Sequence, residues 1–173
     1  MKKLITPLLA ICAIIASVSC KKEGTKTPTN SSVSIKLDGQ KKSFGQDIHA
    51  IKANLSENLY SLVISATSGS ESLNIALWSD KDDFVAGKTF VIASPSATYF
   101  NTLTYASPNN TADPFAMWNS VYQFGNVEQV FECTITESTE QSVRGTFSGI
   151  IYQNSNIAVN SKSVTDGAFF VSY

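Results

Sequence analysis

The sequence predicts an all-β fold, an antiparallel β-sandwich or barrel-like domain of about ten strands. The first observation is a hydrophobic period of two, clearest where Val33, Ile35 and Leu37 alternate with polar residues. The second is a regular series of short apolar segments separated by turn-forming residues. The third is that residues 33–173 show no sustained helical stripe. Together these observations favour a packed or closed sheet over a helical or mixed fold.

A hairpin is expected at the start of this region. Asp38 and Gly39 form a dipeptide that type I′ turns favour, so residues 33–37 should pair with residues 40–44. Residues 47–55 fit either a short helix or an irregular strand, and we favour the strand. Further strands are expected at residues 59–67, 73–79, 89–93, 99–105, 127–137, 143–152 and 164–173.

The alternation breaks between residues 106 and 121, where turn formers such as Pro108 and Pro114 accompany large apolar side chains. Aromatic residues and amide side chains are interleaved from residue 99 to residue 124, and this mixture suits a sugar or a protein surface. The predicted ligand-binding residues are Trp118, Tyr122, Tyr99 and Tyr105. We expect Trp118 and Tyr122 on an accessible surface. In the competing interpretation these rings are buried and cap one end of the β core.

The N-terminal residues have the layout of a secretory signal, since Lys2 and Lys3 precede an apolar segment at residues 4–16. A membrane-spanning helix needs about 20 apolar residues, which this segment does not reach. Residues 17–20 resemble the lipobox of bacterial lipoproteins, although Ser17 stands where that family usually has Leu. The resemblance implies that residues 1–19 are removed and that Cys20 is acylated. An ordinary signal cut near residue 16 or 19 is the alternative.

Lipid attachment at Cys20 makes the membrane an expected partner. Several acyl chains on one cysteine hold stably, because each buried methylene contributes about 0.8 kcal/mol. Lys21 follows Cys20, so the Asp that retains enterobacterial lipoproteins in the inner membrane is absent. We expect an outer-membrane lipoprotein that faces either the periplasm or the outside. Residues 20–32 should form a flexible tether to a single domain at residues 33–173.

Size and charge narrow the class of protein. Removal of residues 1–19 from the 173-residue chain leaves 154 residues, enough for one domain with its own core. The formal charge changes from −1 to −3 as Lys2 and Lys3 leave, and charges of both signs are interspersed. No basic stripe is present, so nucleic acid is not an expected partner. Cys133 would be the one remaining thiol, which excludes an intrachain disulfide.

No catalytic residue, metal or cofactor is indicated. His49 is the only histidine and has no cysteine nearby, whereas nucleophilic, acid–base and metal schemes rely heavily on histidine. Two acidic clusters could act without a histidine: Asp80, Asp82 and Asp83 in a turn, and Glu132, Glu137 and Glu140 near one strand. The first lacks the spacing of a calcium loop, and the second fits a solvated edge better than a glycosidase pair.

Several segments resemble a group of small uncharacterised lipoproteins of the Bacteroidetes. The matching segments are residues 84–90, 131–136, 143–149 and 164–171, so the likeness covers roughly the last 90 residues. The shared positions are glycines and aromatic residues of strands. The resemblance implies a β architecture and an envelope location, and it implies no site or activity.

The leading hypothesis is a non-enzymatic, membrane-anchored binding module for a glycan or an envelope protein, acting through residues 99–124. A lipocalin-like carrier of a small apolar ligand and a hydrolase that uses paired carboxylates are the alternatives. A cavity of several hundred Å³ would favour the carrier, and a filled core would exclude it.

Overall fold

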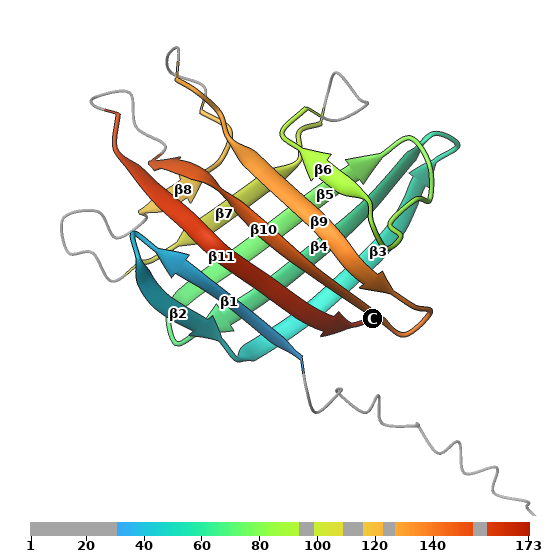
Figure 1. Cartoon of the computed structure of the whole chain (residues 1–173), viewed down its shortest axis with the longest axis horizontal. Helices are drawn as coiled ribbons and strands as arrows, with labels where there is room; N and C mark the ends of the chain where they lie inside the picture. The colour runs from blue at the N-terminus through green and yellow to red at the C-terminus, as the bar shows by residue number, and fades with distance from the viewer. Residues whose placement is uncertain (1–30, 94–98, 109–115, 123–126, 154–158) are drawn as a thin grey trace, which may run out of the picture.

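The computed structural model describes residues 31–93, 99–108, 116–122, 127–153 and 159–173. Within these ranges the chain forms eleven strands and no helix, so the predicted all-β fold is confirmed (Figure 1). Accordingly, no helix that could cross a membrane occurs in these ranges. The strands are β1 (Ser32–Leu37), β2 (Gln40–Phe44), β3 (Gln46–Ser56), β4 (Leu59–Ser68), β5 (Glu71–Ser79), β6 (Thr89–Val91), β7 (Thr102–Ala106), β8 (Met117–Asn119), β9 (Phe131–Ser138), β10 (Ser142–Gln153) and β11 (Ser161–Ser172).

All the strands belong to one antiparallel sheet that curls into a half-barrel. The order along the sheet is β2-β1-β11-β10-β8-β7-β5-β4-β3, and β9 pairs with β10 and β6. Figure 1 shows β2, β1, β11, β10, β9 and β6 in one layer, and the strands of the second layer run across them from behind. Strand β10 links the two layers, because it pairs with β9 over most of its length and with β8 at Tyr152 and Gln153.

The first hairpin has the predicted turn. Asp38 and Gly39 have φ angles of 50° and 80°, and positive values at both central residues define a type I′ turn. Val33 to Leu37 pair in register with Phe44 to Gln40, as expected. Residues 46–56 form strand β3, so the favoured strand interpretation of residues 47–55 is also confirmed.

Alternation along the strands builds the core between the layers. Leu62 and Ile64 of β4 and Ile75 and Leu77 of β5 point inward and are fully buried. Cys133 of β9 is buried, and desolvation raises the pKa of its thiol to about 12. A thiol with that pKa stays protonated and acts as a small core side chain.

Gly145 of β10 permits close packing in the front layer, which is the layer formed by β2, β1, β11, β10, β9 and β6. A Cβ on Gly145 would lie 2.5 Å from both Cζ of Phe169 and the carbonyl oxygen of Thr134. No side chain fits there without a shift of the neighbouring strands. A glycine within a strand is typical of such a close approach of neighbouring groups.

Candidate functional site

A pocket of about 570 Å³ opens between the first hairpin and strands β7, β8 and β11. It lies at the end of the half-barrel where β2, β7 and β8 are seen, on the left of Figure 1. The lining residues are Leu37, Asp38, Gln40, Lys42, Tyr105, Ser107, Trp118, Asn160 and Lys162. The volume is in the range of small-molecule sites, and the lining combines rings, amides, hydroxyl groups and charges.

Two aromatic rings form the wall of the pocket, each with an ammonium group above it. Tyr105 of β7 and Trp118 of β8 are directly paired, and their ring centroids lie 5.6 Å apart. The Nζ atom of Lys42 lies 5.6 Å from the centre of the Tyr105 ring, and that of Lys162 lies 5.1 Å from the Trp118 ring. Both distances fall within the reach of cation–π attraction.

Lys42 belongs to a closed polar cluster with Glu71 and Tyr105. Its Nζ atom donates to both carboxylate oxygens of Glu71, at 2.6 and 2.8 Å, and the Tyr105 hydroxyl donates to Glu71 Oε1 at 2.7 Å. This cluster ties β2 of one layer to β5 and β7 of the other. The three side chains of this cluster therefore already have strong partners within the protein.

The pKa values of this cluster favour the ion pair. Burial alone would lower the pKa of Lys42, but its hydrogen bonds with Glu71 and Tyr105 outweigh burial and raise the pKa. Burial alone would raise the pKa of Glu71, but hydrogen bonds from Lys42 and Tyr105 outweigh it and lower the pKa. Burial and the bond to Glu71 raise the pKa of the Tyr105 hydroxyl. The carboxylate and the ammonium therefore stay charged at neutral pH.

Asp38 and Lys162 form a second, more exposed pair in the pocket wall. The Nζ atom of Lys162 lies 3.3 Å from Asp38 Oδ2, and Asp38 Oδ1 accepts the backbone N–H of Ser163 at 2.9 Å. The backbone N–H of Asp38 also donates to the carbonyl oxygen of Ser163 at 2.9 Å. Two backbone contacts with one residue therefore fix the position of the Asp38 carboxylate.

The formal charges of the pocket cancel. Lys42 and Lys162 carry two positive charges, and Asp38 and Glu71, which is bonded to Lys42, carry two negative charges. The wall also contains a buried donor, the indole N–H of Trp118, which has no hydrogen-bond partner among the residues that the structure describes. Leaving such a donor unpaired costs about 1–3 kcal/mol.

The structure brings together two of the four predicted binding residues. Tyr105 and Trp118 line the pocket, whereas Tyr122 packs against Tyr152 with a centroid distance of 5.4 Å. Tyr99 lies elsewhere, stacked on Trp78 at 4.4 Å, and its side chain is partly exposed. The four residues therefore do not form one binding surface.

The expected accessible position of Trp118 and Tyr122 is wrong. Their exposed fractions are 5% and 6%, because Trp118 points inward from β8 and Tyr122 packs beneath the end of β10. The accessible surface was expected because aromatic residues gather where turn formers interrupt the alternation, but Met117 to Asn119 form a strand between β7 and β10. The interpretation in which the rings cap one end of the core describes these two residues better.

Asp38, Lys42 and Lys162 line the pocket but were not predicted as binding residues. Alternation within β2 offered a signal, because Phe44 is buried and Lys42 therefore faces the same side of the sheet. A lysine on the inward face of a strand needs a partner for its charge, and a lysine paired in this way is typical of a polar site.

Two carboxylates of the acidic turn, those of Asp82 and Asp83, are engaged in ion pairs. The carboxylate of Asp83 accepts from Ser79 Oγ at 2.6 Å and lies 2.5 Å from Lys88 Nζ. Asp82 pairs with Lys52, at 2.6 Å. Within the described ranges, no group of three or more His, Cys, Asp or Glu side chains is arranged to hold a metal ion.

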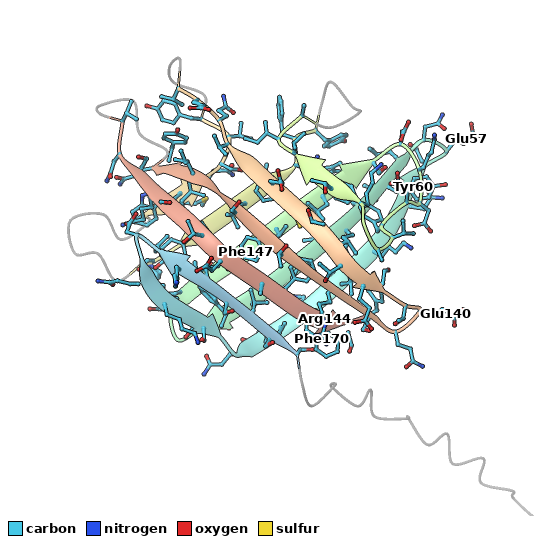
Figure 2. All side chains as sticks on the ribbon, in the orientation of Figure 1. Glu57, Tyr60, Glu140, Arg144, Phe147 and Phe170 are labelled. Carbon is cyan, nitrogen blue, oxygen red and sulfur yellow. The ribbon has the colours of Figure 1, made fainter. Side chains whose placement is uncertain are left out.

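The outer face of the front layer carries a different kind of contact. Figure 2 shows Arg144 and Phe170 side by side, and the guanidinium carbon lies 4.8 Å from the ring centre. Glu137 lies 3.5 Å from Arg144 and completes a surface ion pair. Neither Arg144 nor Phe170 lines the pocket.

Comparisons with protein-family models, curated proteins and solved structures found no match to this chain.

Proposed function

We propose that this protein is a non-enzymatic binding module that holds a short glycan in the pocket between the first hairpin and β7, β8 and β11. The observation that carries the proposal is the composition of the pocket wall, in which the rings of Tyr105 and Trp118 lie beside the charged side chains of Asp38, Lys42 and Lys162. Sugar hydroxyl groups both donate and accept hydrogen bonds, and this wall offers partners of both kinds.

A polar ligand suits this pocket better than an apolar one. An apolar molecule would take Asp38 and Lys162 out of water without giving them hydrogen bonds, which is unfavourable. The interior between the layers is occupied by large buried side chains such as Phe44, Leu77 and Phe169. These features support a glycan over the small apolar ligand of a lipocalin-like carrier.

The carboxylate of Glu71, which is bonded to the pocket residue Lys42, supports binding over hydrolysis. Glycosidases that use two carboxylates need one of them protonated as a general acid, which requires a raised pKa. The pKa of Glu71 is lowered, and Lys42 and Tyr105 already bond to its oxygens. Asp38 is partly exposed and bonded to a backbone N–H. Glu71 therefore does not meet the requirement for a general acid.

The proposal includes anchoring of this module to the cell envelope through an acylated Cys20. Its support is the lipobox-like segment at residues 17–20 and the polar segment that precedes β1. Such an anchor would place the pocket outside the cytoplasm, where glycans of the envelope are available. The outer membrane is the expected location.

Blocking the pocket tests the proposed function. Gln40→Trp introduces a large side chain at an exposed position that lines the pocket, so the fold should tolerate it. Lys41→Trp is the matched control, because Lys41 is the next residue of β2, is also exposed and does not line the pocket. On a glycan array, wild type and Lys41→Trp should bind the same saccharides, and Gln40→Trp should bind none of them. Equal binding by all three proteins, or no binding by wild type, contradicts the proposal.

A further inference from the structure

We propose that the pocket selects an uncharged saccharide and that Asp38 and Lys162 together bind two neighbouring hydroxyl groups of one sugar ring. This inference rests on the proposed function of the pocket. It specifies that the ligand is uncharged and names the two residues that recognise its hydroxyl groups. Lys162 donates to the oxygen of one hydroxyl group, and Asp38 accepts the proton of the next. Tyr105 and Trp118 form the wall behind the ring.

The charge balance of the pocket favours an uncharged ligand. Lys42 is paired with Glu71, and Lys162 is paired with Asp38, so the four charges already compensate one another. A carboxylate on the ligand would lie near the carboxylate of Asp38 and would add a third negative charge beside the two positive ones. An ammonium group would create the opposite imbalance. A neutral polyhydroxyl ligand leaves the balance unchanged and can still form hydrogen bonds with the charged groups of Asp38 and Lys162.

The Lys42–Glu71 and Asp38–Lys162 pairs differ in how many further hydrogen bonds they can make to a ligand. Both oxygens of Glu71 accept from Lys42, and one of them also accepts from Tyr105. Lys162 has a single carboxylate contact at 3.3 Å, longer than the usual hydrogen bond of a charged pair. An ammonium has three donors, and a carboxylate has about four acceptor sites. The Asp38–Lys162 pair is therefore the one that can accept and donate further bonds.

The geometry holds this donor and acceptor side by side before a ligand arrives. The type I′ turn and two backbone bonds to Ser163 fix Asp38. The ammonium of Lys162 lies 5.1 Å above the Trp118 ring, and its side chain is only 27% exposed. Because neither group must be ordered on binding, the entropic cost of recognising two adjacent hydroxyl groups is low.

The chain contains a matched control for this pair. Lys36 and Asp166 form another ion pair between the first hairpin and β11, with a distance of 2.7 Å. Their side chains are 48% and 66% exposed, and neither residue lines the pocket. Loss of one charge from the Lys36–Asp166 pair changes the net charge of the protein as much as loss from the Asp38–Lys162 pair does. The difference in ligand affinity between the two sets of variants therefore measures the effect of a charge within the pocket.

The test uses the full-length protein in detergent and titrates neutral hexose oligosaccharides and uronic-acid oligosaccharides of the same length. Wild type should bind neutral ligands at least ten times more tightly than acidic ones. Asp38→Asn and Lys162→Gln should each weaken binding of the neutral ligand by about ten- to a hundredfold, since each removes a charged hydrogen-bonding partner. Asp38→Asn leaves the pocket with one excess positive charge, so its preference should shift toward the uronic-acid series. Lys36→Gln and Asp166→Asn should bind like wild type.

The outcomes separate this inference from the proposed function. Tighter binding of acidic ligands by wild type, or equal affinities for Asp38→Asn, Lys162→Gln and their controls, overturns the inference while pocket binding of glycans stands. Absence of binding to either series, or binding that Gln40→Trp does not affect, overturns both. Thermal melting of each variant identifies any loss of affinity that comes from unfolding, and Asp38→Asn keeps a residue that tolerates the positive φ of the turn.

Discussion

Replacing Glu71 by Gln removes the carboxylate that accepts three hydrogen bonds from Lys42 and Tyr105. The side chains of Lys42 and Glu71 are 27% and 24% exposed, so this pair lies between a surface ion pair and a buried one. Exposed pairs contribute about 0.2–1 kcal/mol, and breaking a buried pair costs about 3–5 kcal/mol. We therefore expect Glu71→Gln to lower the free energy of unfolding by about 2 kcal/mol, within the range for hydrogen bonds to charged groups.

A double-mutant cycle isolates the contribution of the pair. Glu71→Gln, Lys42→Met and the double variant should show a coupling energy of about 1–2 kcal/mol in urea denaturation, because each single variant leaves the other charge without its partner. A loss of about 2 kcal/mol in a domain of this size corresponds to about 4–8 °C in Tm. The same cycle on Lys36 and Asp166, which are 48% and 66% exposed, is the control and should give less than about 1 kcal/mol.

The pH dependence follows from the directions of the pKa shifts. The pKa of Glu71 is lowered in the folded state, so its contribution is present above the unfolded pKa and is lost as the pH falls through the folded value. The pKa of Lys42 is raised, so its contribution is present below the unfolded pKa and is lost as the pH rises through the folded value. Wild type and Glu71→Gln should therefore converge in stability in acid. If the coupling energy equals that of the control pair, or if the stability difference persists in acid, the cluster does not stabilise the fold as argued.

Two further predictions concern the anchor and the core. Radioactive palmitate should label wild type and should not label Cys20→Ala, since the lipobox-like segment predicts acylation at that residue; equal labelling of both proteins would contradict it. Gly145→Ala should lower the free energy of unfolding by about 1–3 kcal/mol, because the added Cβ overlaps Phe169 and Thr134. Gly45→Ala meets no atom within 4 Å, so it should change stability little, and a larger loss for Gly45→Ala than for Gly145→Ala would refute the packing argument.

Strand positions were predictable where alternation extends over several residues and a turn signal marks its end. The hairpin at Asp38 and Gly39 is the clearest case, because its turn chemistry and its flanking apolar positions agree. Strand β8 was not predicted, since Met117, Trp118 and Asn119 are too few to display a period of two between turn formers. Its pairing depends on β7 and β10, which supply contacts that no local pattern contains.

The pocket could be predicted only in part, for a related reason. Aromatic density pointed to Tyr105 and Trp118, and both line the pocket, although they are buried in its wall. The charged residues come from distant segments, since 29 positions separate Lys42 from Glu71 and 124 separate Asp38 from Lys162. Sequence spacing carries no information about such pairs. They arise when β11 pairs with β1 and the layers close over each other.

Strand register nevertheless gives a rule for finding this kind of site. Lys42 is two residues before the buried Phe44 of β2, and Lys162 is two residues before the buried Val164 of β11. A lysine in phase with a core residue must direct its ammonium toward the interior or toward the end of the barrel. Because an unpaired ammonium in that position is unfavourable, two such lysines near the ends of their strands require nearby carboxylates or a ligand. Here the carboxylates of Glu71 and Asp38 meet that need, and only the Asp38–Lys162 pair keeps capacity for a ligand.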